Sequence, residues 1–372
     1  MDIRQQFPDV HWVWKGGISF VYEVHPRIVV KVPKSGDFEK EQFQKELKVY
    51  KAFSHPPCPS IVQCFYADNG IFLEYIRDIT LCSRIQNNHT RDQHTAIVTK
   101  INDLAQAVAF LESLNLAHSD LRPKNILLDR NQLKLSDFNY TAEIGSDFKA
   151  CIAPYRRILN SNEQDQGRRG SSGFLGPRTE QFALGSLYYL INYGFKVYGD
   201  QRLTEDPKEH RRKVMDLLQD IEFPRLDSDP LIDDIIIKYW HNKYATIAEL
   251  ATYTETLLPG RSRRRDTEAE KISTSQWRAV IGRVIRGLWN SFRSWWAFVL
   301  CRTREVTKPK EANSGKPDSY SGGIEQHDSA EDFFQRKTFC QNLEKRGLLH
   351  MLSLGEPEQL GFSIEWYRHS TS

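Results

Sequence analysis

The sequence has no long hydrophobic run, because no stretch of about 18 apolar residues occurs without a charge, so we expect no bilayer-spanning segment. The first ten residues, MDIRQQFPDV, are polar and lack the apolar core of a signal peptide. The six cysteines form no C-x-x-C pair and no metal-ligand spacing, which is typical of a reducing compartment. These absences predict an intracellular and above all cytoplasmic protein, with peripheral membrane and nuclear locations left open.

Charge of one sign is also scarce, since the net charge of the 372 residues is only +3. With 40% hydrophobic residues and 12% aromatic residues, the chain can form a large core and is not expected to be disordered as a whole. The basic residues are unevenly placed: residues 261–304 contain eleven Lys or Arg and three Asp or Glu. We expect no nucleic-acid partner, and the oligomeric state cannot be read from the sequence.

Short strand patterns and one helix pattern occupy the first 80 residues. Residues 9–33 read as three strands with two tight turns, 37–53 as a helix, and two more strands follow a Pro-rich break. From about residue 92 the pattern is mainly helical, interrupted by a hairpin over 125–137. Apolar residues return over 331–372, which we expect to fold back onto the body as a helix.

The hairpin is flanked by the polar sequences HSDLRPKN and LSDFN. We place its turn around Asn131, so that Asn125 and Asp137 are each six residues away and are predicted to face each other. An amide oxygen opposite a carboxylate suits a hard cation such as Mg²⁺, and Asp120 adds a second carboxylate beside them. The alternative is that these residues only form turns, as Asp and Asn commonly do.

Two charged residues are placed among apolar neighbours in the amino-terminal region. Glu46 lies inside the apolar arc of the helix predicted over 37–53, and Lys31 lies in the middle of the strand IVVKVP. A buried charge is costly unless it is paired, so we predict a Lys31–Glu46 ion pair. The alternative is that Lys31 extends its charge into water, or pairs with Glu39 instead.

The order of these features resembles the eukaryotic protein-kinase domain: a Gly-rich turn, a strand Lys, a helix Glu, H-x-D-x-x-x-x-N, then D-F-x. The resemblance covers about residues 10–257, and the run GPRTEQFALGSLYYLINYGF is similar to small kinase-like proteins of filamentous fungi. It implies an α+β, two-lobed fold with a small, mainly antiparallel sheet lobe that has one helix, a larger mainly helical lobe and a C-terminal helical extension. The expected parts are a small lobe (1–80), a large lobe (81–258), a basic linker with a Trp/Arg-rich amphipathic helix (259–304), a disordered linker (305–330) and a C-terminal helical tail (331–372).

The resemblance implies an ATP- and Mg²⁺-dependent protein kinase that transfers the γ-phosphate to Ser or Thr hydroxyls of protein substrates. The residues with implied catalytic roles are Asp120 as proton acceptor, Lys31 on the phosphates, and Arg122 near the transferring phosphate. The implied nucleotide-binding residues are Gly16, Gly17, Lys31, Glu46, Glu74, Ile76, Asn125 and Asp137, with Glu74 and Ile76 in the hinge. Asn125 and Asp137 are the implied metal ligands.

Several positions depart from the family pattern. The three glycine places of the phosphate loop hold Trp14, Gly16 and Ser19. Ser119 replaces the arginine that commonly docks a phosphorylated activation loop, and Asn139 takes the glycine place after Asp-Phe, where an Asn tolerates left-handed backbone. Glu180 stands where an Asp usually bonds to the catalytic-loop backbone, and the usual buried Glu–Arg pair of the activation segment has no match.

These departures leave two other functions open. A pseudokinase would bind nucleotide or partner proteins without transfer, and a small-molecule phosphotransferase would share H-x-D-x-x-x-x-N. Residues 277–299 form an amphipathic pattern with tryptophans and arginines, which fits either peripheral contact with an anionic membrane or packing on the kinase body. The run RSRRR at 261–265 fits either a nuclear address or a solvated linker.

Overall fold

The computed structural model describes residues 3–53, 58–77, 80–87, 101–129, 132–148, 151–163, 166–167, 170–257 and 330–369. These described parts belong to one structural unit of the chain. The segment predicted over 259–304, including the helix of 277–299, lies outside the described residues, as does 305–330 except for Ala330. Within the described ranges, no helix is both long enough and apolar enough to cross a bilayer.

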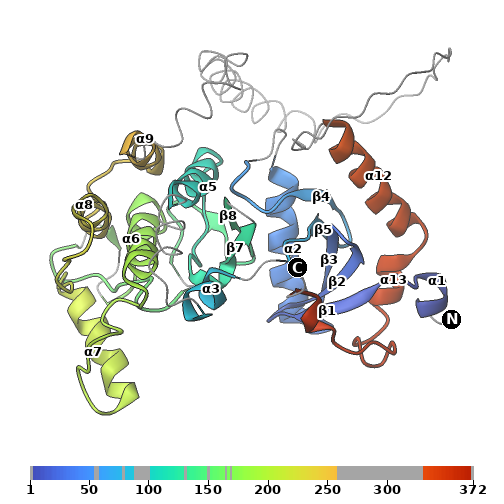
Figure 1. The fold of residues 1–372 in the computed structure, drawn as a ribbon, viewed down its shortest axis with the longest axis horizontal. Helices are drawn as coiled ribbons and strands as arrows, with labels where there is room; N and C mark the ends of the chain where they lie inside the picture. The colour runs from blue at the N-terminus through green and yellow to red at the C-terminus, as the bar shows by residue number, and fades with distance from the viewer. Residues whose placement is uncertain are drawn as a thin grey trace, which may run out of the picture. The chain divides into compact units, whose positions relative to one another are not determined.

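The amino-terminal part is built on a five-stranded sheet in the order β1-β2-β3-β5-β4, in which all neighbouring strands are antiparallel (Figure 1). Its strands are β1 (His11–Lys15), β2 (Ser19–His25), β3 (Ile28–Pro33), β4 (Cys64–Ala67) and β5 (Ile71–Glu74). β-branched and aromatic residues dominate these strands, which explains their extended conformation. Lys31 on β3 is paired with Val21 on one side and Ile71 on the other, so it lies in the middle of the sheet.

Helix α2 (Asp37–Ala52) packs on one face of this sheet. Asp37 and Glu39 occupy its first turn, where negative charge is favourable to the helix dipole. Phe43, Leu47 and Tyr50 are buried on the side that faces the sheet and the rest of the core, and Glu46 is buried among them. The spacing of these residues therefore fixes which face of the helix points inward.

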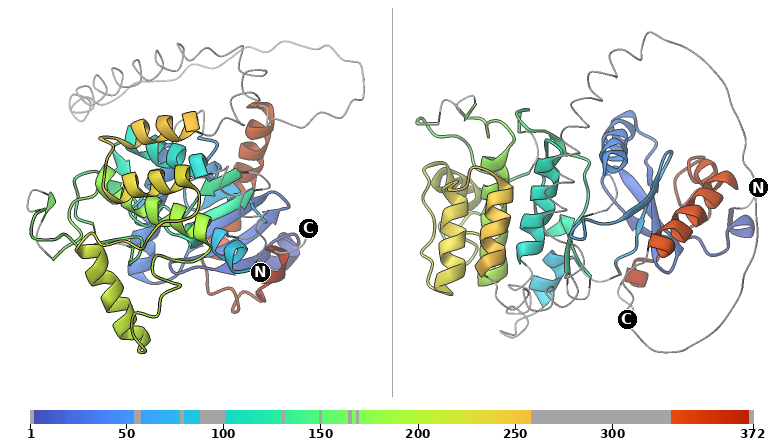
Figure 2. Two further views of the ribbon diagram at one scale, coloured as in Figure 1. Left: turned by 60° about the vertical axis from the view of Figure 1, so that its left-hand side comes forward. Right: turned by 90° about the horizontal axis from the view of Figure 1, so that it is seen from above.

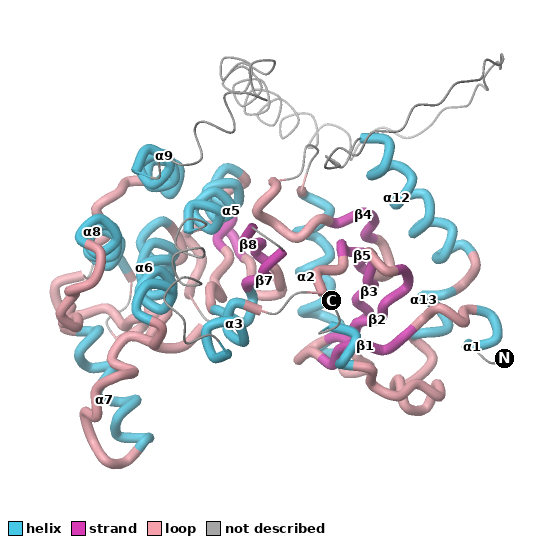
Figure 3. Tube along the Cα trace, viewed as in Figure 1, coloured by secondary structure: helices cyan, strands magenta, loops and turns pink. Residues whose placement is uncertain are grey.

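The second large part is mainly helical, as the colours of Figure 3 show. It follows β5 in the chain. Its helices are α3 (Leu81–Asn87), α5 (Ile101–Ser113), α6 (Pro177–Tyr193), α7 (Pro207–Gln219), α8 (Pro230–Trp240) and α9 (Ile247–Leu257). Its short strands and its 3₁₀ turn are β6 (Leu116–Ala117), η1 (Pro123–Asn125), β7 (Ile126–Asp129), β8 (Gln132–Leu135) and β9 (Ala142–Glu143). Every residue of α6 from Arg178 to Ile191 is buried, so this helix forms the centre of the part.

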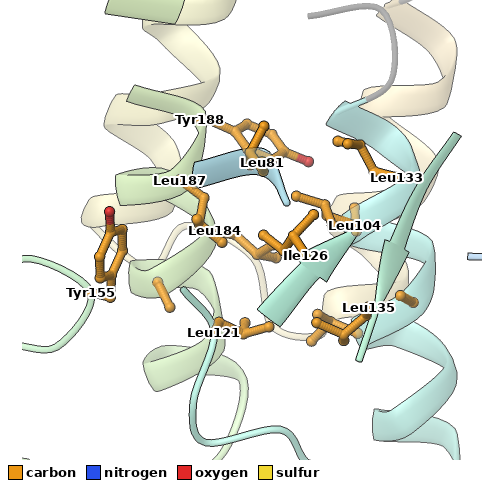
Figure 4. Close-up of a cluster of buried hydrophobic side chains, with 14 of the residues drawn as sticks. Leu81, Leu104, Leu121, Ile126, Leu133, Leu135, Tyr155, Leu184, Leu187 and Tyr188 are labelled. Carbon is orange, nitrogen blue, oxygen red and sulfur yellow. The ribbon is translucent and has the colours of Figure 1, made fainter. Parts of the chain in front are cut away.

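The core of the helical part surrounds the hairpin β7–β8. Leu121 and Ile126, on either side of η1, are fully buried with Leu184 and Leu187 of α6 (Figure 4). Leu104 of α5 closes the same cluster. Apolar residues at both ends of the loop between β6 and β7 thus hold that loop against the rigid helices α5 and α6.

The carboxyl-terminal segment returns to the sheet and covers the face opposite α2. Its elements are α12 (Ala330–Lys345), α13 (Leu348–Leu352) and the 3₁₀ turn η3 (Trp366–His369). The short amino-terminal helix α1 (Ile3–Gln6) packs in the same hydrophobic cluster through Ile3. In Figure 2 the red helices lie across the blue sheet from α2. The predicted fold class, with two parts and a C-terminal helical extension, is confirmed.

Candidate active site

Lys31 and Glu46 form the predicted ion pair. The Lys31 ammonium donates to both carboxylate oxygens of Glu46 at 2.7 Å, and the Glu46 side chain is completely buried. Burial alone would lower the pKa of Lys31, but the carboxylates of Glu46 and Asp137 outweigh burial and raise it. Lys31 therefore stays charged at the centre of the sheet.

Asp137 reaches the same ammonium from the end of the hairpin, with its Oδ1 3.3 Å from Lys31 Nζ. The next residue holds it there: Phe138 is fully buried, its backbone N–H donates to Glu46, and its ring lies 5.2 Å from those of Tyr50 and Phe53. Asn139 is of a type that tolerates left-handed backbone, but the positive φ in this loop, 65°, is at Asp137.

The predicted register of the hairpin is wrong by one residue. Ile126 pairs with Leu135, and both the backbone N–H and the hydroxyl of Ser136 donate to the Asn125 carbonyl at 2.9 Å. Asn125 thus faces Ser136, and Asp137 is one position farther on. The turn around Asn131 was placed half a residue off, because a sequence pattern of Asp, Arg and Asn does not determine whether two or three residues form the loop.

A buried carboxylate fixes the backbone before Asp120. Glu180 of α6 accepts hydrogen bonds from the backbone N–H groups of His118 at 2.9 Å and Ser119 at 3.3 Å, the kind of contact that the resemblance implies for an acidic residue at this position. Burial raises the pKa of Glu180 to about 7. Ser119 has a φ of 68°, so these bonds stabilise a strained turn that directs the next residue, Asp120.

His118 supports the same turn from inside the core. Burial lowers its pKa to about 4, so the imidazole is neutral at physiological pH. Its Nδ1 accepts from the Asp120 backbone N–H at 3.3 Å, which leaves Nε2 to donate to the Ser136 carbonyl at 3.1 Å. The ring also contacts that of Phe138, so one histidine joins the loop of Asp120 to the loop of Asp137.

Asp120 itself is buried and is oriented by two neighbours. The Asn125 amide donates to its Oδ2 at 2.9 Å and to its backbone carbonyl at 2.8 Å, and the Arg122 guanidinium lies 2.8 Å from Oδ2. Burial raises the pKa of Asp120 to about 6, although Arg122 and Asn125 act in the opposite direction. A carboxylate with a pKa near neutrality is suited to accepting a proton.

The residues at the metal position fit Mg²⁺ in kind and number. The Asn125 amide nitrogen is committed to Asp120, which leaves its oxygen as the group free to act as a ligand, and the Asp137 side chain is about one third exposed. Within the described ranges, no cluster of three or more His, Cys, Asp or Glu is arranged to hold a metal. One carboxylate and one amide oxygen are typical of Mg²⁺, which usually keeps waters and substrate phosphates as its other ligands.

The Gly-rich turn between β1 and β2 is tight. Gly16 N–H donates to the Ser19 carbonyl at 2.9 Å, and Lys34 donates to the Gly17 carbonyl at 2.8 Å. A Cβ at Gly17 would have open space around it, whereas one at Gly16 would lie 3.2 Å from the Ser19 carbonyl. Trp14 follows a bulge in β1 and is 54% exposed, so its ring is not packed into the core below the turn.

The Glu74 carboxylate does not extend into solvent at the predicted hinge. It accepts from Lys134 at 2.6 and 2.7 Å and from the Gln63 backbone N–H at 2.6 Å, so it joins β5 to the hairpin of the helical part. The Glu74 backbone N–H donates to the Gln63 carbonyl at 2.9 Å, so any contact of Glu74 with a nucleotide would use its backbone carbonyl. The peptide groups of Ile76 form no hydrogen bond to any residue in the described ranges.

Sequence reasoning missed an ion pair within the activation segment. Arg157 donates through both of its terminal nitrogens to the Glu163 carboxylate, and Glu163 also accepts from the Asn160 backbone N–H at 3.1 Å. Arg178, at the start of α6, is buried nearby and donates to the Ser172 carbonyl at 2.5 Å. No motif marks this pair, because its members are six residues apart in a loop. It stabilises the segment where the family's usual Glu–Arg pair is missing.

Comparison with known proteins agrees with this geometry. Residues 15–277, more than half of the chain, match the protein kinase domain family. Serine/threonine-protein kinase PknB of Mycolicibacterium smegmatis is 24% identical, and the match covers 63% of this chain and 40% of the relative. Serine/threonine-protein kinase DCLK3 of Mus musculus is 22% identical, and the match covers 65% of this chain and 28% of the relative. The probable serine/threonine-protein kinase fhkE of Dictyostelium discoideum is 24% identical, and the match covers 44% of this chain and 24% of the relative. The matched regions thus span well under half of these relatives' lengths. By the order of its strands, its Lys31–Glu46 pair and its match over residues 15–277, the chain belongs to the protein kinase domain family.

Proposed function

We propose that the protein is an ATP- and Mg²⁺-dependent protein kinase that phosphorylates Ser or Thr hydroxyls of protein substrates. The observation that carries the proposal is that Lys31 contacts both Glu46 and Asp137, while Asn125 is hydrogen-bonded to Asp120 on one side and to Ser136, the residue before Asp137, on the other. The residue types needed to hold phosphates, hold a metal and accept a proton are thereby brought to neighbouring loops.

Lys31 would hold the α- and β-phosphates. Glu46 fixes the position of the ammonium with two short bonds, so that little side-chain freedom remains to be lost when a nucleotide binds. The turn at Gly16 and Gly17 would place backbone N–H groups near the triphosphate, and the peptide groups of Glu74 and Ile76 would meet the adenine.

Asn125 and Asp137 would hold Mg²⁺, and the ion supplies positive charge that offsets the charge of the phosphates during transfer. The bonds from Asn125 to Asp120 tie the metal ligand to the proton acceptor, so that a shift of one displaces the other. Phe138, packed under α2, keeps Asp137 close to Lys31.

Asp120 would accept the proton of the substrate hydroxyl as the oxygen attacks the γ-phosphorus and the bond from that phosphorus to the β,γ-bridging oxygen breaks, which releases ADP. Arg122 lies on the same carboxylate and would place its positive charge near the transferring phosphoryl group. Pro123, at the start of η1, is part of the run DLRPKN, which favours Ser or Thr over Tyr as substrate. The names of the relatives agree with that choice.

The proposal is tested by radiolabelled-phosphate transfer from ATP to a peptide library, with Asp120→Asn and the control Asp129→Asn. Asp129 also carries a carboxylate but lies at the far end of β7 and pairs with Gln132 at the turn of the hairpin. Loss of the acceptor should lower the rate by about 10²- to 10⁴-fold, and Asp129→Asn should leave it nearly unchanged.

A pseudokinase is the second candidate, and the Trp14 and Ser19 substitutions in the phosphate loop favour it. It predicts a rise in melting temperature with Mg·ATP and no transfer above the Asp120→Asn level. Transfer to a metabolite pool, but to no peptide, would instead indicate a small-molecule phosphotransferase.

A further inference from the structure

The carboxyl-terminal segment is part of the amino-terminal core. Apolar residues of α12, α13 and the following loop form a hydrophobic cluster with the side chains on the sheet face opposite α2. The tail contributes Cys340, Leu343, Leu348, Leu349, Met351, Leu352 and Phe362 to this cluster. Phe362 lies edge-on to the fully buried Tyr22 of β2, with ring centroids 5.3 Å apart. The tail therefore has a fixed register on the face opposite α2.

Beyond Phe362 the tail passes the free edge of β1. The Glu365 backbone N–H donates to the Trp12 carbonyl at 2.7 Å, which adds the tail to the edge strand of the sheet. The Glu365 carboxylate lies 3.2 Å from His11 Nδ1. The Trp12 indole in turn donates to the Trp14 carbonyl at 3.0 Å, so the tail is bonded directly to the strand that leads into the Gly-rich turn.

The last described residues of the tail reach the face of the sheet that carries Lys31. Glu23 is two residues from Val21 on β2, and Val21 is paired with Lys31, so Glu23 and Lys31 share one face. Arg368 donates to Glu23 Oε2 at 2.9 Å from the tail. The tail thus covers one face of the sheet with its helices and contacts the other face with Arg368.

Glu23 also binds the predicted hinge. Arg77, the residue after Ile76, donates to Glu23 Oε1 at 2.8 Å, and its guanidinium lies 5.2 Å from the centre of the Tyr75 ring. Glu23 is only 2% exposed, and the guanidinium groups of Arg77 and Arg368 together compensate for its lost hydration. One buried carboxylate therefore joins β2, the hinge and the end of the tail.

We propose that Arg368 is a positioning residue for nucleotide binding: through Glu23 and Arg77 it fixes the hinge segment, while Glu365 fixes β1. The effect on Mg·ATP binding rests on the proposed function, whereas the positioning of the hinge does not. In a protein without the Arg368 guanidinium, Arg77 alone pairs with Glu23, and the peptide groups near Ile76 are held less rigidly. The tail is then an intrinsic part of the nucleotide site rather than a separate appendage.

The test compares Arg368→Gln with Arg346→Gln in the 372-residue chain. Arg346 is the matched control, because it also belongs to the tail but donates to the Gln6 carbonyl at 3.1 Å and lies over Phe7, away from β1 and the hinge. We expect Arg368→Gln to raise the Kd and KM for Mg·ATP about tenfold, the scale of a lost charge-assisted hydrogen bond, with kcat at saturating ATP little changed. Arg346→Gln should leave the Kd and KM unchanged, and Arg368→Lys should restore part of the affinity.

Hydrogen exchange provides the readout that does not depend on nucleotide. Peptides covering residues 71–77 should exchange faster in Arg368→Gln than in Arg346→Gln, while melting temperatures stay similar. Equal exchange and equal affinity in the two variants would overturn the inference, whatever the catalytic activity. If the wild type binds no Mg·ATP, the proposed function fails, and the exchange comparison still decides whether Arg368 positions the hinge. Should Arg368→Gln not fold, Arg368→Lys carries the comparison with a smaller expected loss of affinity, because lysine keeps the charge but not the guanidinium.

Discussion

Helix α2 and the carboxyl-terminal tail cover opposite faces of the same sheet, and they contribute differently to it. α2 brings a completely buried carboxylate, Glu46, to the ammonium of Lys31. The helices of the tail bring apolar side chains, and charged groups reach the sheet from the tail's end, where Arg368 meets Glu23. The face under α2 thus contains a buried ion pair, whereas the face under the helices of the tail is apolar.

The two ion pairs, Lys31–Glu46 and Glu23–Arg368, also differ in whether the remaining charge is compensated when one partner is removed. The Lys31 and Glu46 side chains are 12% and 0% exposed, so neither can be hydrated when its partner is removed. Arg368 is 32% exposed, and Glu23 retains Arg77 when Arg368 is lost. We therefore expect substitutions under α2 to affect both stability and activity, and substitutions in the tail to affect stability or affinity separately.

The largest effect is expected for Lys31→Met. Removing the ammonium leaves Glu46 buried without a cation, which costs about 3–5 kcal/mol of folding stability in comparable pairs. Phosphotransfer should also fall by at least about 10²-fold, because the phosphates lose a positioned charge. Urea unfolding and the radiolabel assay measure the two losses.

The double variant Lys31→Met/Glu46→Gln separates these losses. It should regain part of the stability, because the uncompensated charge is gone, but none of the activity. Wild-type transfer rates in Lys31→Met would contradict the assignment of this face as the phosphate-binding face.

The ion pair under α2, Lys31–Glu46, could be predicted from the sequence, whereas the ion pair at the end of the tail, Glu23–Arg368, could not. Lys31 and Glu46 interrupt apolar patterns 15 residues apart, so each residue marks itself as buried and in need of a partner. Glu23 lies in a strand where acidic residues are not unusual, and its partner Arg368 is 345 residues away. Nothing local indicates that this carboxylate is buried or which arginine reaches it.

The hairpin shows a different limit. The residue types Asn125 and Asp137 were found by their spacing, but their register was one residue off, because the loop length is set by backbone geometry rather than by the side-chain pattern. The residue type at position 139 likewise does not show that the left-handed backbone is at Asp137. The neighbouring Phe138 packs against Tyr50 and Phe53, and such tertiary contacts cannot be read from the local sequence.

A smaller effect, confined to stability, is expected for Gly70→Ala under the tail. Gly70 lies between β4 and β5, and an added Cβ would be 2.7 Å from Leu349 Cδ2 and 3.3 Å from the Lys31 carbonyl. Because Leu349 is buried and the carbonyl belongs to a central strand, overpacking should cost about 1–3 kcal/mol. Leu349→Ala alone should cost about 2–5 kcal/mol by leaving a cavity.

The combination of the two substitutions tests whether the tail is part of the core. The alanine methyl would occupy space vacated by Leu349, so the double variant should be more stable than the sum of the single losses predicts, as judged by urea unfolding. Additive losses would mean that Leu349 does not pack on Gly70 in solution, and the contrast between the two faces would lose its basis. Transfer rates at saturating ATP should stay near wild type in all three variants well below their melting temperatures.

The smallest effect is the pH dependence, which distinguishes the catalytic loop from the tail. Burial raises the pKa of Asp120 to about 6, so the carboxylate binds a proton as the pH falls through this value and can no longer accept one from the substrate. kcat/KM should therefore fall below about pH 6, by roughly tenfold per pH unit well under the pKa. Arg368→Gln acts on affinity through the hinge and does not touch Asp120, so its profile should be lower throughout but bend at the same pH as wild type. A bend displaced by Arg368→Gln would mean that the tail is coupled to the proton acceptor, and not only to the nucleotide-binding face of the sheet.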